Sequence, residues 1–513
     1  MRAPPTTTLS RGLPALLALV ACTPQLDLDN RPPPCLSGQE VCPTSGTCMS
    51  TKDAKNVDVC KYAISVRQGG SNLVPVPGFS PDDVRITSSA DVVTTVVPSM
   101  TGAAISVSAP HGTRPDIRTI TITTKVDGVP VSRDINVIVS QIAVRPDGSD
   151  EAAGTTEHPF QTLLHAASVA GSGDTLKLLS GSASTNGVPA EAATADPVPL
   201  AAGLSIEGED GNQTIPVVLV PAGGISFDRV RLDQRLAITA PNSKVSLHNV
   251  MAVRGITVAA TAIGSSLEIS GGSEIRSDDA LTAESDGPVV VRAPAASLTL
   301  LWQTSIRPTG THGVDAIYMT GRDQTFTMLD AVVDTGFGSN RTVALDGPTM
   351  VTIQRSNING RVEINAPTAD ATIATTTFVA AQSGGIMFRG ATLMVAGCKL
   401  TGVPIEQASP ASTVHVRNTQ FLLYGAFGYR LWNGQLDLGT KDDPGNNIFQ
   451  KNASIGAGAA LDIEEPVGGN NGVTVSASTF DGQPINSFVA MGPTPPPANS
   501  IFYIANAVSI SFE

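Results

Sequence analysis

One short unit recurs along the second half of the chain, and its clearest copy is Val351-Thr352-Ile353-Gln354-Arg355-Ser356-Asn357-Ile358-Asn359-Gly360. Apolar residues stand at the first, third and eighth positions of this unit, and a small residue stands at the sixth. Alternation of apolar and polar residues with a period of two is typical of a half-buried β-strand. The unit therefore predicts an apolar strand, a tight corner and a second short strand.

Further copies of the unit follow along the chain. Close copies begin at Leu393 and Val473, and looser copies begin at Ala371 and Val414. Additional starts are Val245, Leu267, Leu298, Phe326 and Leu436. A repeat of 20 to 22 residues with two-residue alternation fits one coil of a parallel β-helix. Leucine-rich repeats have a similar length, but their fixed Leu and Asn positions are missing.

Two details of the repeat give further expectations. The 37 residues between the starts at 436 and 473 hold either an unrecognised coil or a large excursion. In a stack of coils, the small residues at the sixth position form one inward ladder. Its members are Ser356, Thr376, Cys398, Thr419 and Ser478. We therefore interpret Cys398 as a buried structural thiol.

A distinct passage opens the repeat region. Pro146-Asp147-Gly148 is followed by His158-Pro159-Phe160-Gln161-Thr162-Leu163-Leu164 and then by Gly173-Asp174-Thr175-Leu176-Lys177-Leu178. Four apolar residues share one helical face: Phe160, Leu163, Leu164 and Ala167. Pro159 suits a first helical turn, and Gly171 with Gly173 ends the helix. We predict a short helix that covers the open first coil, since an uncovered end presents unpaired strand groups.

This passage resembles the opening of right-handed parallel β-helix domains in the pectin-lyase-like superfamily. The resemblance covers residues 146–513 and implies an all-β fold, a right-handed parallel β-helix (solenoid) with a short N-terminal capping helix. Leu436-Asp437-Leu438-Gly439-Thr440 and the following Pro444-Gly445-Asn446-Asn447-Ile448-Phe449 are similar to a late-coil motif of bacterial β-helix surface proteins. Such motifs specify a fold and leave the activity open, because one fold supports many functions.

The first 22 residues predict the location of the protein. Arg2 and Arg11 precede a short apolar run that ends at Ala21, so residues 1–21 are interpreted as a signal peptide. Leu19-Val20-Ala21-Cys22 resembles the lipobox of bacterial lipoproteins, which implies acylation of Cys22 and anchoring in the cell envelope. Thr23, in place of Asp, favours the outer membrane, on its periplasmic or its surface-exposed face. The alternative is an ordinary signal peptide with a chance cysteine.

Two segments follow the lipidation site. Residues 22–34 carry Cys22 and the run Pro32-Pro33-Pro34, which predicts a stiff spacer. Residues 35–60 hold four cysteines: Cys35, Cys42, Cys48 and Cys60. In an exported chain this cluster predicts two disulfides with three possible pairings. A zinc site is the alternative, but the cluster has no CxxC pair.

Residues 61–143 alternate in the manner of strands and contain turn signals. The clearest predicted strands are Ile64–Val66, Val84–Ile86, Ala104–Val107, Ile117–Thr123 and Ile135–Val139. Several short strands at this spacing predict a small immunoglobulin-like β-sandwich.

Charge and motif content exclude several function classes. The net charge of −13 and the absence of a basic patch argue against a nucleic-acid partner. The sequence contains no Walker-type loop, Rossmann glycine fingerprint, GxSxG elbow or HExxH spacing. We therefore expect no cofactor and no metal site.

Carboxylates are candidates for polysaccharide cleavage. The paired candidates are Asp278-Asp279, Asp442-Asp443, Glu464-Glu465, and Asp330 with Asp334. Glycoside hydrolysis needs two carboxyl groups at a set separation, whereas adjacent residues on a strand point to opposite faces. We interpret these pairs as solvated turn residues. His312 and Asp315 resemble the histidine-glycine loops of pectin-hydrolysing β-helices, but the accompanying motifs are missing, so no catalytic residue is assigned.

Aromatic residues gather in one coil. Phe421, Tyr424, Phe427, Tyr429 and Trp432 are five of the 21 aromatic residues of the chain. Phe421 stands at an inward position of the repeat. Tyr424, Tyr429 and Trp432, with Arg430 between them, are predicted to form an exposed platform on which sugars stack. The alternative is a local core, because large aromatic side chains are mostly buried.

Three functions are compatible with these expectations. The first is a non-enzymatic surface lipoprotein whose β-helix binds a polysaccharide or a protein partner, since long solenoid faces suit extended ligands. The second is a polysaccharide lyase or glycoside hydrolase of the same fold, which would need a carboxylate-lined face with Arg or Lys beside it. The third is a structural envelope component with a buried aromatic coil and flat faces rich in Ser and Thr.

Overall fold

The computed structural model describes residues 39–41, 48–50, 63–100, 102–126, 128–180, 197–215, 217–277, 287–308, 315–334, 341–379, 385–424, 427–452, 459–463, 471–485, 502–504 and 508–512. These residues divide into two compact units. The first contains 71–108 and 117–138, and the second contains 66–70, 109–116 and the residues from 139 onward.

The first unit is the β-sandwich predicted between residues 61 and 143. One sheet contains β3 (Ala63–Arg67), β9 (Val129–Ser140), β8 (Asp116–Val126) and β5 (Arg85–Ser88), and the other contains β4 (Ser71–Pro77), β7 (Gly102–Ser108) and β6 (Val93–Ser99). The helical turn η1 (Pro81–Asp83) precedes β5. Val76 and Ile105 of one sheet and Ile120 and Val137 of the other are fully buried. Four of the five strands predicted from the sequence lie within observed strands, and the fifth, Val84–Ile86, begins one residue before β5. The strands β4 and β6 were not foreseen.

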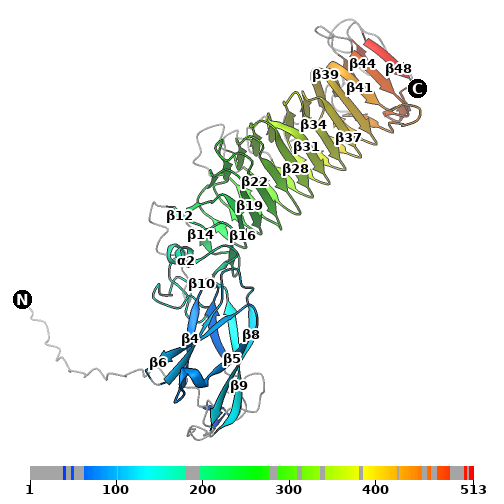
Figure 1. Ribbon diagram of the computed structural model, residues 1–513. Helices are drawn as coiled ribbons and strands as arrows, with labels where there is room; N and C mark the ends of the chain where they lie inside the picture. The colour runs from blue at the N-terminus through cyan, green and yellow to red at the C-terminus, as the bar shows by residue number, and fades with distance from the viewer. Residues whose placement is uncertain are drawn as a thin grey trace, which may run out of the picture. The chain divides into compact units, whose positions relative to one another are not determined.

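The second unit is a stack of parallel coils, and the predicted right-handed parallel β-helix is confirmed (Figure 1). Its strands form three faces, here named A, B and C, and each coil passes through them in the order A, C, B. Face A consists of β10 (Ile142–Val144), β11 (Thr175–Leu178), β13 (Leu204–Gly208), β16 (Gly223–Asp228), β19 (Ser243–His248), β22 (Ser266–Ser270), β25 (Ser297–Leu300), β28 (Gln324–Leu329), β31 (Pro348–Gln354), β34 (Asp370–Ala374), β37 (Thr392–Ala396), the C-terminal parts of β39 (Ile405–Arg417) and β41 (Phe427–Leu438), β44 (Asn471–Val475) and β48 (Val508–Phe512).

Face B joins face A in one 24-stranded sheet because β39 and β41 run through both. Its strands are β18 (Leu236–Ile238), β21 (Ile256–Val258), β24 (Val289–Val291), β27 (Ile317–Met319), β30 (Val343–Leu345), β33 (Arg361–Ile364), β36 (Gly385–Phe388), the N-terminal parts of β39 and β41, β43 (Ala459–Ile463) and β47 (Phe502–Ile504).

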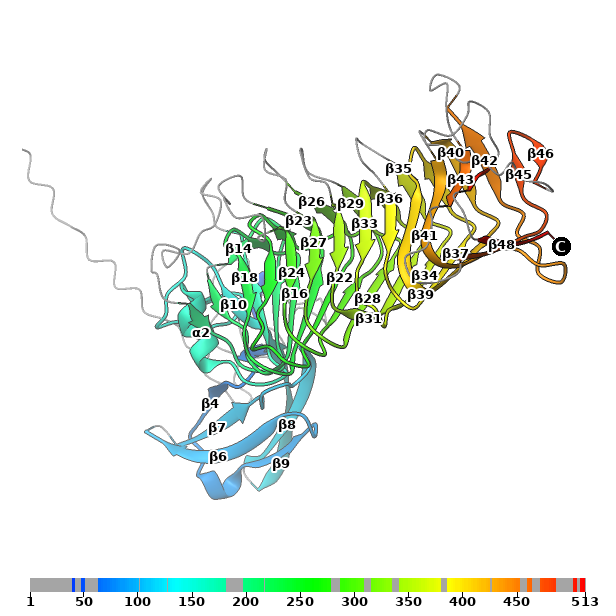
Figure 2. The same ribbon diagram turned by 90° about the horizontal axis from the view of Figure 1, so that it is seen from above.

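Face C is a separate sheet of 13 strands (Figure 2). It contains β14 (Thr214–Ile215), β17 (Arg231–Leu232), β20 (Met251–Ala252), β23 (Glu274–Arg276), β26 (Ser305–Arg307), β29 (Val332–Asp334), β32 (Asn357–Asn359), β35 (Thr377–Val379), β38 (Lys399–Thr401), β40 (Gln420–Tyr424), β42 (Ile448–Lys451), β45 (Thr479–Phe480) and the antiparallel β46 (Gln483–Pro484). A small extra pair, β12 (Val198–Pro199) with β15 (Val218–Leu219), lies outside the three faces.

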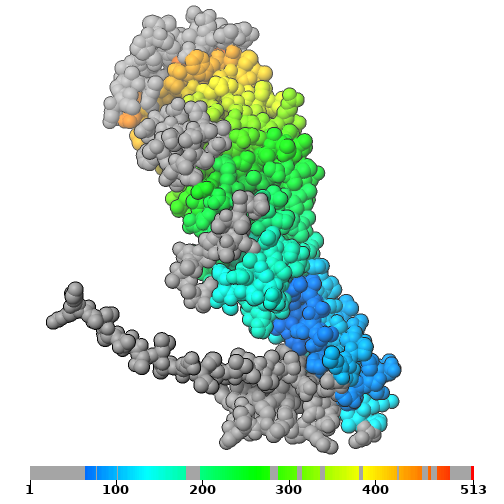
Figure 3. Space-filling view, turned by 90° about the vertical axis from the view of Figure 1, so that its left-hand side faces the viewer, coloured from blue at the N-terminus to red at the C-terminus, as the bar shows by residue number. Residues whose placement is uncertain are grey.

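The register of face A confirms the repeat that the sequence predicts. Every predicted start pairs with the next one in the same row, from Val245 with Leu267 to Leu436 with Val473. Because Leu436 and Val473 are direct neighbours, the 37 residues between them form one long coil and no extra coil. Figure 3 shows the coils following one another in chain order along the solenoid.

The predicted inward ladder lies at the corner between faces A and C. Its five members have exposed fractions of 4% or less. The Cys398 thiol is 2% exposed and lies 3.5 Å from the carbonyl oxygens of Ile373 and Ala396. Burial raises the pKa of this thiol to about 11, which keeps it in the unreactive protonated form. The interpretation of Cys398 as a structural residue is confirmed.

The same corner has a repeating backbone conformation. Arg229, Asn249, Asp330, Arg355, Thr375, Asn418 and Ala477 each have φ between 47° and 54°. This left-handed conformation costs roughly 1–2 kcal/mol for a residue other than glycine. At six of these seven corners the N–H donates to a carbonyl of the next coil, as from Asn249 to Ser270 and from Arg355 to Ala374. These hydrogen bonds offset the strain, so the stack enforces the corner.

The first coil is covered by α2 (Leu163–Val169), as the sequence predicts. Thr162 is the N-cap and its side chain accepts a hydrogen bond from the His165 N–H at 3.2 Å. Two details of the prediction are wrong. Leu164 is 51% exposed, and Ala166 is buried instead. Pro159 precedes the cap, because the helix begins only at Leu163, and this start turns Leu164 away from the core.

The segments before residue 63 are described only in part. β1 (Gln39–Val41) pairs antiparallel with β2 (Cys48–Ser50). The predicted signal peptide, the spacer and the side chains of the cysteine cluster lie outside the described residues.

The inward rows of face A determine stability. We expect Phe326→Ala to lower the free energy of unfolding by about 3–5 kcal/mol, because this fully buried ring fills the row between Leu298 and Val351. The measurement is chemical denaturation followed by circular dichroism. Thr327→Ala, on the outward side of the same strand, is the control and should change the value by less than about 0.5 kcal/mol. Equal losses in both variants would contradict the inward register.

Candidate functional site

Face B carries a cluster of charged side chains on its later coils. Its central outward row has one residue per coil: Tyr318, Ala344, Glu363, Met387, Glu406, Arg430 and Asp462. The strand period of two points these side chains away from the core. From Glu363 onward, acidic and basic groups dominate this row.

Arg341 links carboxylates of two coils at the start of the charged part. Its guanidinium contacts Asp315 through two hydrogen bonds of 2.8 and 3.2 Å. The same group lies 3.8 Å from Glu363, one coil further along in the opposite direction. Arg361 also binds Glu363, at 2.9 Å. This arrangement joins three consecutive coils through charge-assisted hydrogen bonds to Asp315 and an ion pair with Glu363.

A second chain of polar contacts runs along the edge of face B. Asn365 donates to Asp346 at 2.7 Å, and Arg389 donates to the side-chain oxygen of Asn365 at 2.7 Å. Two rows of side chains, one central and one at the edge, therefore present carboxylates and guanidinium groups together.

Asp315 has an unusual protonation equilibrium. Burial raises its pKa from 3.8 to about 6, and the nearby carboxylates of Glu363 and Asp346 add to the rise. Arg341 opposes this effect but does not cancel it. Only 6% of the residue is exposed. A carboxyl group with a shifted pKa in a charged cluster is a frequent mark of a functional site.

The exposed aromatic platform predicted from the sequence is wrong for both tyrosines. Tyr424 and Tyr429 are fully buried, and the Tyr429 hydroxyl donates to Gln407 at 2.6 Å. Burial raises the pKa of both hydroxyl groups. Residues of a strand alternate between inside and outside, so Tyr429 and Leu431 face the core while Arg430 and Trp432 face outward. The inward position predicted for Phe421 is confirmed.

The outward half of the aromatic coil forms a compact cluster. The Arg430 guanidinium lies 4.0 Å from the centre of the Phe427 ring and 5.0 Å from that of Trp432. It also contacts Asp462 at 2.6 Å. Trp432 is 42% exposed. Stacking of a cation between two rings fixes the guanidinium and leaves aromatic surface open to a ligand.

Asp330 and Asp334, one of the carboxylate pairs considered in the sequence, are bound by arginines. Asp330 contacts Arg355 through bonds of 2.7 and 2.9 Å, and Asp334 contacts Arg307 at 3.1 Å. Asp278-Asp279, Glu464-Glu465 and His312 lie outside the described residues.

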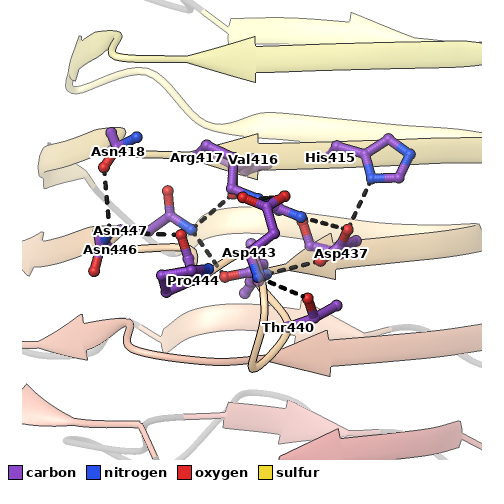
Figure 4. A network of polar contacts seen from close by, with 12 residues as sticks. His415, Val416, Arg417, Asn418, Asp437, Thr440, Asp443, Pro444, Asn446 and Asn447 are labelled. Carbon is purple, nitrogen blue, oxygen red and sulfur yellow. Dashed lines mark hydrogen bonds and ion pairs between the residues drawn. The ribbon is translucent and has the colours of Figure 1, made fainter. Parts of the chain in front are cut away.

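The late-coil motif has a structural role, which Figure 4 shows. Arg417 bridges Asp437 and Asp443, at 2.6 and 2.7 Å, and His415 contacts Asp437 at 2.8 Å. Burial alone would raise the pKa of Asp437, but hydrogen bonds from Arg417, His415 and the Gly439 N–H outweigh it and lower this pKa.

Asn447 completes the corner beneath this network. Its side chain is fully buried and donates to the carbonyl oxygens of Val416 and Leu438, at 3.0 and 3.2 Å. It also accepts a hydrogen bond from the Thr419 N–H at 3.1 Å. The motif thus closes a long coil by satisfying backbone groups that the corner leaves without partners.

The remaining sequence predictions concern the lipid anchor, the disulfides and metals. Cys22, Cys35, Cys42 and Cys60 lie outside the described residues, and only the backbone of Cys48 is described. Among the described residues, no group of three or more His, Cys, Asp or Glu side chains is arranged to hold a metal ion. The helices within this part of the chain are too short or too polar to span a membrane.

Comparisons with known proteins do not assign the chain to a family. No family model, no curated protein and no solved structure matches the chain. The candidate site therefore depends on the geometry of this chain alone.

The sequence pattern singled out Asp315 but not its partner Arg341, and His312 lies outside the described residues. The pattern places Asp315 close to His312 along the chain, and the structure pairs Asp315 with Arg341, 26 residues further along. The distance between Arg341 and Glu363 in the sequence is close to one coil. A search for opposite charges separated by one repeat would have found this cluster, because such residues become neighbours when coils stack.

The raised pKa of Asp315 predicts a pH effect on stability. A folded-state pKa of about 6, above the ordinary 3.8, means that the native state binds the proton more tightly. This contribution is fully present below pH 4 and is lost as the pH rises through about 6. We therefore expect the stability of the native protein, relative to Asp315→Asn, to fall over this range. Denaturation at several pH values measures the difference.

Asp330→Asn provides a control of opposite sign. Hydrogen bonds from Arg355 lower the pKa of the exposed Asp330, so its contribution is lost as the pH falls. A flat difference for Asp315→Asn across the same pH range would contradict the assignment.

Proposed function

We propose that the protein is a lipid-anchored cell-envelope protein whose β-helix is a non-enzymatic binding module. In this proposal face B binds an extended polysaccharide along the row from Tyr318 to Asp462. The observation that carries the proposal is the Arg430 cluster, in which a guanidinium lies between the rings of Phe427 and Trp432 beside Asp462.

The chemistry of this row suits a glycan. Aromatic faces pack against the apolar faces of sugar rings, and the indole N–H of Trp432 offers a hydrogen bond. Carboxylates accept hydrogen bonds from hydroxyl groups, and guanidinium groups bind carboxylates of acidic sugars. Neighbouring coils lie about 4.8 Å apart, so the row offers contacts at regular steps along a polymer.

The alternative is a polysaccharide lyase or hydrolase of the same fold. It is favoured by Asp315, whose raised pKa suits a general acid. Its second carboxyl would be Glu363, two coils away and thus about 10 Å along the stack. Arg341 lies on the intervening coil and contacts both carboxylates. A guanidinium therefore occupies the space that a scissile bond would need, which supports binding over cleavage.

The anchor in this proposal is Cys22. We expect Cys22→Ser to move the protein from the membrane fraction to the soluble fraction, because stable attachment of lipoproteins depends on the acyl chains of this residue. Cell fractionation with immunodetection measures the distribution, and metabolic labelling with a fatty acid reports acylation. Cys398→Ser is the matched control and should leave both unchanged. Membrane retention of unlabelled Cys22→Ser protein would contradict the anchor.

Glycan binding is tested with the full chain carrying Cys22→Ser and a panel of pectate, alginate, xylan and dextran with calcium. We expect retention on at least one polymer without release of reducing or unsaturated ends. Trp432→Ala should then weaken binding about tenfold, which corresponds to about 1.4 kcal/mol. Affinity electrophoresis measures retention, and a reducing-end assay and ultraviolet absorbance measure cleavage.

Trp302→Ala is the control for this experiment. Trp302 is 62% exposed but lies at a corner between faces A and C, so its loss should leave binding unchanged. Equal effects of the two tryptophan variants would place the ligand away from the Arg430 cluster. New chain ends would support the enzyme in place of the binding module.

A further inference from the structure

A different surface of the solenoid is flat, regular and nearly uncharged. It consists of three outward rows on the six consecutive face A strands β19, β22, β25, β28, β31 and β34, and is named here the face A strip. The first row is Lys244, Ser266, Ser297, Thr325, Met350 and Asp370. The second row is Ser246, Glu268, Thr299, Thr327, Thr352 and Thr372. The third row is His248, Ser270, Leu301, Leu329, Gln354 and Ala374.

The strip lies open between short turns. The connections that border these six strands on both sides are among the described residues, and the strands lie side by side in Figure 1. Lys244, Glu268, Met350 and Asp370 are exposed, and most of the Ser and Thr side chains are half-buried by their neighbours. A regular surface of short hydroxyl side chains presents little relief, which suits contact with another flat surface.

Lys244 and Asp370, two of the three formally charged residues of the strip, are placed symmetrically about its middle. The third, Glu268, has the neutral Thr352 at its matching position. Lys244 and Asp370 stand in the same row, on the first and the last of the six strands. The middle of the strip, between β25 and β28, holds the apolar pair Leu301 and Leu329. Opposite charges at equal distances from a centre are the pattern of a self-complementary surface.

We propose that two copies of this chain pair through the face A strip, with their β-helices antiparallel. The two-fold axis lies in the interface and passes between β25 and β28. Lys244 of each copy then faces Asp370 of the other, Thr299 faces Thr327, and Leu301 faces Leu329. The interface has two Lys–Asp ion pairs at its ends, and apolar contact with hydroxyl groups at its centre.

Other registers of the two copies do not place Lys244 opposite Asp370. A shift of the axis by half a coil in either direction places Lys244 opposite Met350 or Thr392, and Asp370 then faces Gly224 or Ser266. A parallel pair with its axis along the second row places Glu268 opposite its own copy, and like charges in contact are unfavourable. The charge pattern therefore selects the antiparallel register described above.

The size of the strip sets the strength of the pairing. Six coils extend over about 29 Å at about 4.8 Å per coil, and three outward rows are narrow, so each copy buries less than the roughly 800 Å² of a standard interface. We expect weak, reversible association, in the micromolar to millimolar range. The two terminal ion pairs make it sensitive to salt, which screens exposed charges.

The pairing goes beyond the proposed function and does not depend on it, because face A and face B are different surfaces. An antiparallel pair has the N-terminal ends of its β-helices at opposite ends.

The test is a charge reversal and its rescue in the full chain carrying Cys22→Ser. Sedimentation equilibrium over a range of protein concentrations measures association, and circular dichroism checks the fold. By symmetry, Lys244→Glu disrupts both ion pairs, and so does Asp370→Lys. We expect each single reversal to weaken association at least tenfold, because like charges then meet at both ends. The double variant restores opposite charges in both pairs and should recover the original association.

Lys399→Glu is the matched control, because it makes the same charge change on an exposed residue of face C. It should leave association unchanged. A protein that stays monomeric at all concentrations would overturn the proposal. So would single reversals that leave association unchanged, or a double variant that remains as weak as the single ones.

Discussion

The structure of the solenoid depends on backbone hydrogen bonding from each coil to the next. In the interior of the stack the strands pair with both neighbouring coils. At the corner between faces A and C, the backbone N–H donates a hydrogen bond to a carbonyl of the following coil. This repeated bond holds non-glycine residues such as Arg355 and Thr375 in a left-handed conformation that they rarely adopt alone. Because every coil must meet its neighbour in the same register, side chains one repeat apart become neighbours. Inward rows then form a continuous core, and outward rows form regular surfaces.

The three faces use this register in different ways. On face B, Asp315, Arg341 and Glu363 lie on successive coils and form a bridge of alternating charge across three coils. On face A, the central rows are hydroxyl side chains with charges at the two ends. At the corner beside face C, Arg417, Asp437 and Asn447 satisfy the backbone of a long coil. The first arrangement concentrates polar groups at a potential ligand site, the second presents a flat docking surface, and the third stabilises the fold.

Burial decides the role of the aromatic coil. Tyr424 and Tyr429 fill the interior, where Tyr429 stands in an inward row between Ile405 and Leu461. Only Arg430 and Trp432 remain on the outside, and the guanidinium lies between two rings instead of pointing freely into solvent. The surface that remains is smaller than the platform expected from the aromatic content. It nevertheless combines aromatic area with fixed charge in the way that carbohydrate recognition requires.

The sequence by itself determined the fold class, the coil register and the inward ladder that contains Cys398. Period-two alternation and a fixed repeat length are local properties, and stacking transmits them unchanged, so the starts from Val245 to Val473 were found without a structure. The period-two alternation of the strand also places Tyr429 inside and Arg430 outside, and this could be read from the sequence. The aromatic content alone suggested a single exposed platform. Only the tertiary structure decided which charges meet. Asp315 contacts Arg341, and Lys244 shares a row with Asp370, although the members of each pair are far apart along the chain. Which residues become neighbours depends on loop lengths that differ from coil to coil. The loop lengths decide which residues share a row. A short local sequence pattern does not contain the combined length of the loops between two distant residues.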